Sequence, residues 1–167
     1  MIEIRTETDS DRELIHEVTE SAFKGKQYAD GDEQDLIDTL RSMDALSLSL
    51  VALEDGKLVG QISFSPANIS VGTSPWYALG PVSVLPGRQG FGIGSQLIEA
   101  GILEITNRGA LGCILTGDPN YYFRFGFKLS PDHCPDTEPE EYFMLKLLNG
   151  KNPEGKFSFH EAFTSNA

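Results

Sequence analysis

A glycine-rich turn between an apolar strand and a long amphipathic helix is the feature that most restricts how this chain can fold. The run from 76 to 85 predicts a central strand, and the apolar spacing from 92 to 108 predicts a helix. Gly90, Gly92 and Gly94 lie at their junction. Because glycine lacks a Cβ, successive backbone N–H groups can converge there on an anion at the helix N-terminus. The turn therefore predicts a phosphate cradle, although glycines also form tight turns for packing alone.

The segments around this turn predict an α/β domain with a mixed sheet. Alternating or continuous apolar residues indicate strands near 2–4, 48–53, 58–65, 76–85, 111–115, 141–147 and 156–160. Helical spacing indicates helices near 9–23, 32–43, 92–108 and 120–124. The Asp55-Gly56 turn favours an antiparallel hairpin, whereas strand, helix and strand from 76 to 115 favour a parallel crossover. We expect one domain over residues 1–167.

Charge is distributed unevenly along the chain. The formal net charge is −12, which argues against a phosphate-tracking surface and hence against a nucleic-acid partner. From Gly56 to Ile98, however, there is no Asp or Glu, and the only cations are Lys57 and Arg88. An anion could dock on this acid-free segment. Alternatively, buried strands simply exclude carboxylates.

Targeting and metal-binding signals are absent from the sequence. No run approaches the roughly 20 apolar residues of a membrane span, and the N-terminus lacks a basic region followed by an apolar one. We therefore expect a cytoplasmic protein without a membrane partner. Cys113 and Cys134 have no metal-ligand spacing, and Cys113 lies in an apolar strand. His16 is expected to be solvated, and His160 has no companion ligands, so no metal is expected. The adjacent His133 and Cys134 lack a third partner for nucleophilic catalysis.

Two motifs decide which kind of phosphate fits the turn. A Walker loop is excluded because Gly-Lys-Ser/Thr is missing, and a dinucleotide fingerprint needs a glycine where Ser95 stands. The run 89–94 reads Gln-Gly-Phe-Gly-Ile-Gly and fits a Q/R-x-x-G-x-G/A signature. It resembles the GNAT superfamily of acyl-CoA-dependent N-acyltransferases. The run 121–127 resembles that family's Tyr-x-x-x-Gly-Phe element, with Tyr122 as its tyrosine. The preceding Gly-Asp-Pro at 117–119 resembles a bacterial subgroup of predicted acetyltransferases.

The resemblance implies a particular architecture and cosubstrate. It implies a mostly antiparallel sheet of about six to seven strands with about four helices, splayed between the fourth and fifth strands. Acetyl-CoA would lie in the splay, without a metal, and its pantetheine arm would bond to main-chain groups as an added strand does. The glycine and proline at 80–81 are unusual inside a strand and indicate a bulge that opens one edge. The implied cofactor-binding residues are Val82, Val84, Gln89, Gly90, Phe91, Gly92, Ile93, Gly94 and Ser95.

The resemblance also implies direct transfer to a primary amine of a small molecule or peptide. The Val84 N–H would stabilise the tetrahedral oxyanion, and Tyr122 would protonate the departing thiolate. The strand from 76 to 85 carries no carboxylate or histidine that could deprotonate the amine. Glu33 and Asp118 are candidates for that base, and each also has an ordinary interpretation as a helix cap or solvated charge.

Two other functions remain open at this point. A CoA-binding sensor or interaction module could keep the phosphate cradle without turnover, and the missing base favours it. A nucleotide-binding domain would differ because ATP or NAD would compete with CoA. The expected assembly is a monomer or a homodimer, and the identity of the amine is undetermined.

Overall fold

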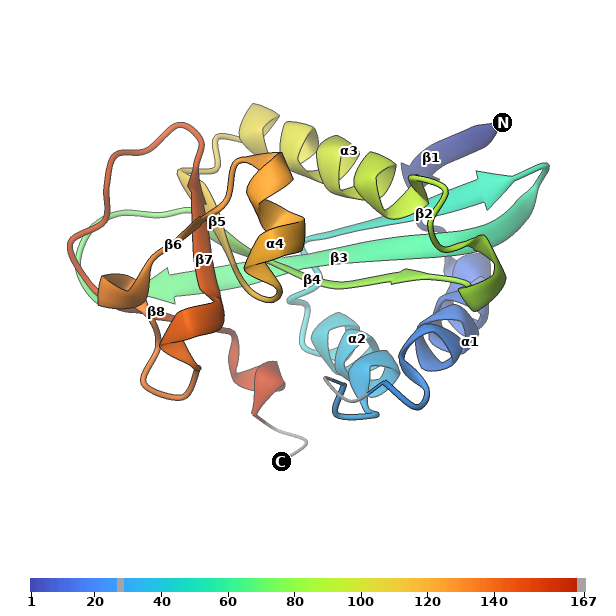
Figure 1. The fold of residues 1–167 in the computed structure, drawn as a ribbon, viewed down its shortest axis with the longest axis horizontal. Coiled ribbons are helices and arrows are strands. Elements are labelled where there is room, and N and C mark those ends of the chain that lie inside the picture. Colours follow the sequence, from blue (N-terminus) through green and yellow to red (C-terminus); the bar gives the residue numbers. More distant parts are fainter. Residues whose placement is uncertain (27–28, 165–167) are drawn as a thin grey trace.

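The computed structural model describes residues 1–26 and 29–164, in which four α-helices surround an eight-stranded sheet (Figure 1). The strands are β1 (Ile2–Thr6), β2 (Leu48–Glu54), β3 (Lys57–Ile69), β4 (Trp76–Val84), β5 (Gly112–Thr116), β6 (Lys128–Leu129), β7 (Phe143–Leu147) and β8 (Phe157–Ser158). The helices are α1 (Arg12–Phe23), α2 (Glu33–Ser42), α3 (Ile93–Asn107) and α4 (Pro119–Tyr122). No helix in these ranges combines the length and apolar character needed to cross a bilayer.

The sheet is mixed and mostly antiparallel, as predicted. Its order is β1-β2-β3-β4-β5-β7-β6, and β8 pairs with the end of β3. The β4–β5 pair is parallel, because α3 carries the chain across the sheet between them. Sequence periodicity did not predict β6, since a strand of two residues has no readable period.

The helices cover opposite faces of the sheet and thereby fix where α3 begins. In Figure 1, α3 lies along one face, while α1 and α2 lie on the other. Leu97, Ile98 and Ile105 of α3 pack into the main core cluster with Phe64 of β3. Gly101 allows this close approach, because a Cβ there would collide with the Phe64 ring. The core contact holds the N-terminus of α3 beside the end of β4.

A partly buried ion pair joins β1 to the start of α1 and makes stability pH-dependent. Arg5 Nη1 lies 2.7 Å from Asp11 Oδ2, which also accepts a hydrogen bond from the Thr8 amide. The hydrogen bond from Arg5 lowers the pKa of Asp11 to about 2. Since the folded-state pKa is depressed, this stabilisation is complete above the ordinary carboxyl pKa of about 4 and is lost as the pH falls towards 2.

The Asp11→Asn variant tests this coupling. We expect it to lower the free energy of unfolding by about 1–2 kcal/mol at pH 7, because the charge-assisted bond to Arg5 is lost. The difference from the wild type should shrink as the pH falls through the range 4 to 2. Urea unfolding at several pH values measures it, and a difference that stays constant with pH would contradict the assignment.

Candidate active site

The parallel strands β4 and β5 pair over only part of their length. Their register joins Trp76 with Gly112, Tyr77 with Cys113 and Ala78 with Ile114. Within the described residues the strands do not pair beyond this point, although β4 continues to Val84 and β5 to Thr116. The β3–β4 register shifts where Gly80 and Pro81 face a single residue of β3, which is the bulge that the sequence indicated. The last part of β4 therefore has an unpaired edge.

The register also determines which main-chain groups lie along this unpaired edge. The Leu85 amide donates to the Val59 carbonyl at 2.9 Å, and Ser83 pairs with Gln61. Main-chain groups alternate sides along an antiparallel strand. The amides and carbonyls of Val82 and Val84 therefore point away from β3, towards the region where β5 diverges.

The glycine turn presents a row of backbone amides next to this edge. Gly90 and Gly92 have φ values of 85° and 82°, which bend the chain so that Gly92 caps α3. Within the part of the chain that the structure describes, no acceptor binds the amides of residues 89–95, and the first amide of α3 to find a backbone partner is that of Gln96. The side-chain amide of Gln89 donates to the Val84 carbonyl at 3.0 Å and ties the turn to the strand end. The amides of residues 93–95 thus have no partner among the described residues at the N-terminus of α3, which favours an anion.

Two adjacent tyrosines, whose rings pack edge to face with centroids 5.0 Å apart, contact different glycines of this region. Tyr122 packs against Gly117, where a Cβ would lie 2.7 Å from its ring, and Gly117 directly follows β5. Its ring also lies 5.9 Å from that of Phe127. The Tyr121 hydroxyl lies 3.3 Å from the position of a Cβ on Gly94, so Tyr121 faces the glycine turn. Tyr121 was not among the predicted site residues, because the motif alone does not place its hydroxyl.

Comparison with known proteins identifies the family. The profile of the acetyltransferase (GNAT) domain matches residues 3–130. The chain belongs to the GNAT family of acetyltransferases. The family predicted from the glycine turn and the tyrosine element is thus confirmed, and so is the assignment as an N-acetyltransferase.

Solved GNAT structures resemble this enzyme over nearly its whole length. A GNAT acetyltransferase from Brucella melitensis, solved with acetyl-CoA, is 44% identical with a TM-score of 0.86, covering 98% of both chains. YhbS from Escherichia coli, solved with CoA, has a TM-score of 0.89 at 27% identity, covering 99% of this chain and 93% of YhbS. In sequence comparison, the uncharacterized N-acetyltransferase YhbS of strain K12 is 30% identical over 151 residues, which cover 85% of this chain and 89% of YhbS.

The two carboxylates suggested as bases in this GNAT enzyme both bind backbone amides of their own loops. Glu33 accepts hydrogen bonds from the amides of Asp30 and Gly31, and Asp118 caps α4 by accepting from the Asn120 amide at 3.0 Å. Asp118 is thus a helix cap, as one interpretation of the sequence had it, whereas Glu33 binds the loop before α2 and does not cap that helix.

A third carboxylate lies beside the divergent end of β5. Glu138 accepts a hydrogen bond from the Thr116 hydroxyl at 2.8 Å. Among the described residues no cation forms an ion pair with Glu138. Sequence reasoning missed it because it lies in a loop without a motif, and nothing local relates residue 138 to residue 116.

The two cysteines of this GNAT enzyme are buried, and their environments do not favour the nucleophilic thiolate form. Burial raises the pKa of the Cys113 thiol and of the Cys134 thiol. The Nδ1 of His133 lies 2.8 Å from the Gly155 carbonyl oxygen, and the Cys134 thiol contacts the Pro135 carbonyl oxygen. Both thiols therefore stay protonated at neutral pH, as a packing role requires.

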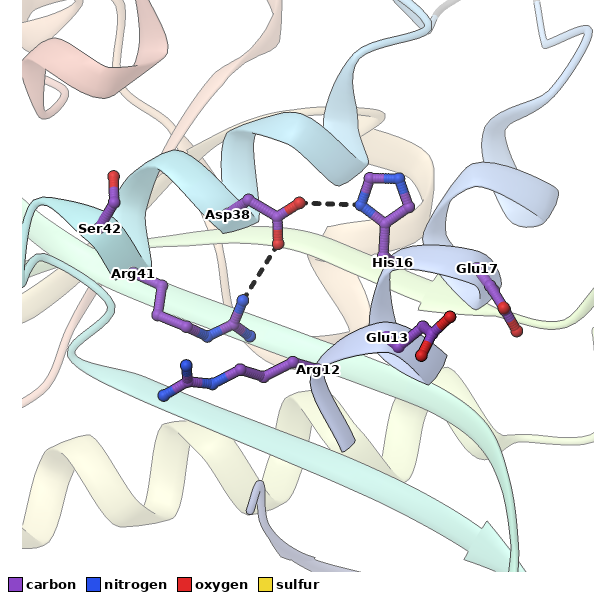
Figure 2. A pocket seen from close by; sticks show the side chains of 7 residues that line it. All are labelled: Arg12, Glu13, His16, Glu17, Asp38, Arg41 and Ser42. Atoms are coloured by element: carbon purple, nitrogen blue, oxygen red, sulfur yellow. Dashed lines mark hydrogen bonds and ion pairs between the residues drawn. The ribbon is translucent and has the colours of Figure 1, made fainter. Parts of the chain in front are cut away.

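A hollow of about 630 Å³ lies between α1 and α2 (Figure 2). His16 Nδ1 lies 2.8 Å from an Asp38 oxygen, and Arg41 Nη1 lies 3.1 Å from the other (Figure 2). Arg41 also binds Glu7 at 2.9 Å. The sequence predicted a solvated His16, but the structure shows it bonded to Asp38 across the helix pair. The His16–Asp38 contact joins α2 to α1.

Proposed function

We propose that this protein transfers the acetyl group of acetyl-CoA to a primary amine by direct attack. The row of amides from Gln89 to Ser95 beside the unpaired edge of β4 is the observation that carries the proposal. The diphosphate of CoA would accept hydrogen bonds from that row. The pantetheine arm would bond to the main chain of Val82 and Val84 in the manner of an added strand. The CoA and acetyl-CoA held by the two similar solved structures support this placement.

The proposed reaction needs no covalent enzyme intermediate. The neutral amine attacks the thioester carbonyl, and the Val84 N–H stabilises the resulting oxyanion. The C–S bond then breaks as the amide forms, and Tyr122 donates its hydroxyl proton to the departing thiolate. The attacking nitrogen releases one proton to solvent as the amide forms, and Tyr122 regains its proton from solvent. The products are the acetylated amine and CoA thiol.

Calorimetric titration with CoA, followed by a thiol-release assay with acetyl-CoA and a panel of amines, tests the proposal. The panel contains benzylamine, a diamine, a polyamine and a lysine-containing peptide. Saturable CoA binding and amine-dependent thiol release are expected. Binding without release on any amine would support the non-catalytic CoA-binding module instead. Absence of CoA binding would remove both functions.

Glu138 is the carboxylate that we propose accepts the proton from the incoming ammonium group, directly or through one water molecule. It lies at the end of β5, and the adjoining Gly117 touches Tyr122. The Thr116 hydroxyl holds one of its oxygens in place. The proton passes from Glu138 to solvent after each turnover.

The Glu138→Gln variant is expected to lower kcat/KM for an alkylamine about a hundredfold, because general base catalysis contributes roughly 10²- to 10⁴-fold. CoA affinity should be unchanged. Glu141→Gln, which alters an exposed acid of the same loop, is the matched control and should keep full activity. Equal effects of the two substitutions on the pH–rate profile would contradict a specific role for Glu138.

A further inference from the structure

Phe91 is a large aromatic side chain in an unusual place. It lies within the glycine turn between Gly90 and Gly92, and 65% of its surface is exposed. Single exposed apolar residues are ordinary on protein surfaces. This one, however, stands among backbone amides that have no partner among the described residues.

Arg88 fixes the orientation of the Phe91 ring. Its guanidinium carbon lies 4.6 Å from the ring centroid, in cation–π geometry. The same guanidinium binds Glu54, at the end of β2, with an Nη2–Oε2 distance of 2.6 Å. Arg88 Nε is buried and finds no hydrogen-bond partner in the described part of the chain. The side chain is therefore held between β2 and the turn.

This arrangement leaves one face of the ring covered and the other available. No other ring or cation among the described residues stacks on Phe91. Because Glu54 already neutralises Arg88, the guanidinium acts by positioning the ring rather than by attracting a phosphate. A fixed aromatic face costs little entropy when it stacks on a flat ligand group.

We infer that Phe91 is the stacking platform for the adenine base of CoA and that Arg88 is its positioning residue. The inference rests on the proposed function, since it places the diphosphate on the amides of residues 89–95. In CoA only the ribose separates the adenine base from that diphosphate. A diphosphate bound at the turn therefore brings the base close to Phe91. Stacking of a base on an aromatic side chain strengthens binding by about 5- to 100-fold.

Binding affinities for three ligands distinguish the contribution of the adenine base from that of the phosphates. The ligands are CoA, dephospho-CoA and 4′-diphosphopantetheine, which keeps both bridging phosphates and lacks adenosine. We expect Phe91→Ala to weaken CoA and dephospho-CoA about tenfold or more and to leave 4′-diphosphopantetheine unchanged. Arg88→Gln should produce a smaller loss with the same ligand pattern. Phe123→Ala removes another exposed ring, outside the turn, and should alter none of the three affinities.

The fluorescence of a Phe91→Trp variant reports contact with the base directly. It would not change on ligand binding if residue 91 had only a structural role. This fluorescence, corrected for the buried Trp76, should be quenched by CoA and dephospho-CoA but not by 4′-diphosphopantetheine. Equal losses for all three ligands in Phe91→Ala, or unchanged CoA affinity, would overturn the inference while leaving the proposed function intact. A wild-type protein that binds none of the three would overturn both.

Discussion

Replacing Gly92 with valine is expected to weaken CoA binding at least about a hundredfold, because it disturbs several of the amides proposed to bind the diphosphate. Gly92 caps α3 with a φ of 82°, a conformation that a β-branched residue strongly disfavours. To relieve this strain the turn must rotate, and the amides on either side of residue 92 would no longer converge. Calorimetric titration with CoA measures the effect.

Gly109 provides a matched control at the other end of the same helix. It has a φ of 89° and, like Gly92, no atom within 4 Å of the position its Cβ would occupy. Gly109→Val therefore imposes comparable backbone strain without touching the turn. We expect the two variants to lose similar thermal stability, while only Gly92→Val loses CoA affinity. Equal CoA affinities in the two variants would show that the amide row does not hold the diphosphate.

The Tyr122→Phe variant is expected to lower kcat by about 10²-fold or more with CoA affinity largely unchanged, since it removes the proposed proton donor to the thiolate. The packing of its ring on Gly117 and Phe127 is retained in the variant. Single-turnover thiol release separates this chemical step from CoA binding.

Tyr121→Phe removes a hydroxyl one residue earlier and serves as the comparison. Because the Tyr121 hydroxyl lies beside Gly94, its loss should change CoA affinity more than kcat. A larger kcat loss in Tyr121→Phe than in Tyr122→Phe would transfer the proton-donor role to Tyr121. Unchanged kcat in both variants would exclude Tyr121 and Tyr122 as the proton donor.

The elements that sequence predicted well are those with a local physical signature. The strand before the glycine turn and helix α3 follow from apolar periodicity, and the turn follows from the spacing of glycines. The irregularity of β4 was readable because proline and glycine are poor residues for a paired strand. Strand β6 was missed because its two residues pair only through their position beside β7.

The candidate site likewise contains residues that the sequence could predict and residues that it could not. The amides of residues 89–95 and the tyrosine element were readable because each lies within one continuous segment. Glu138 was not readable, because its contact with Thr116 joins residues 22 positions apart. The Arg88–Glu54 pair, which orients Phe91, joins residues 34 positions apart.

By itself, the sequence determined the family, the strand–turn–helix unit and the position of the glycine turn, because backbone preferences and side-chain periodicity act over a few neighbouring residues. Only the tertiary structure decided which tyrosine faces the turn, which carboxylate stands at the end of β5 and which cation supports the exposed ring. Those relations depend on how distant segments pack, and such packing produces no periodic pattern in the amino-acid sequence.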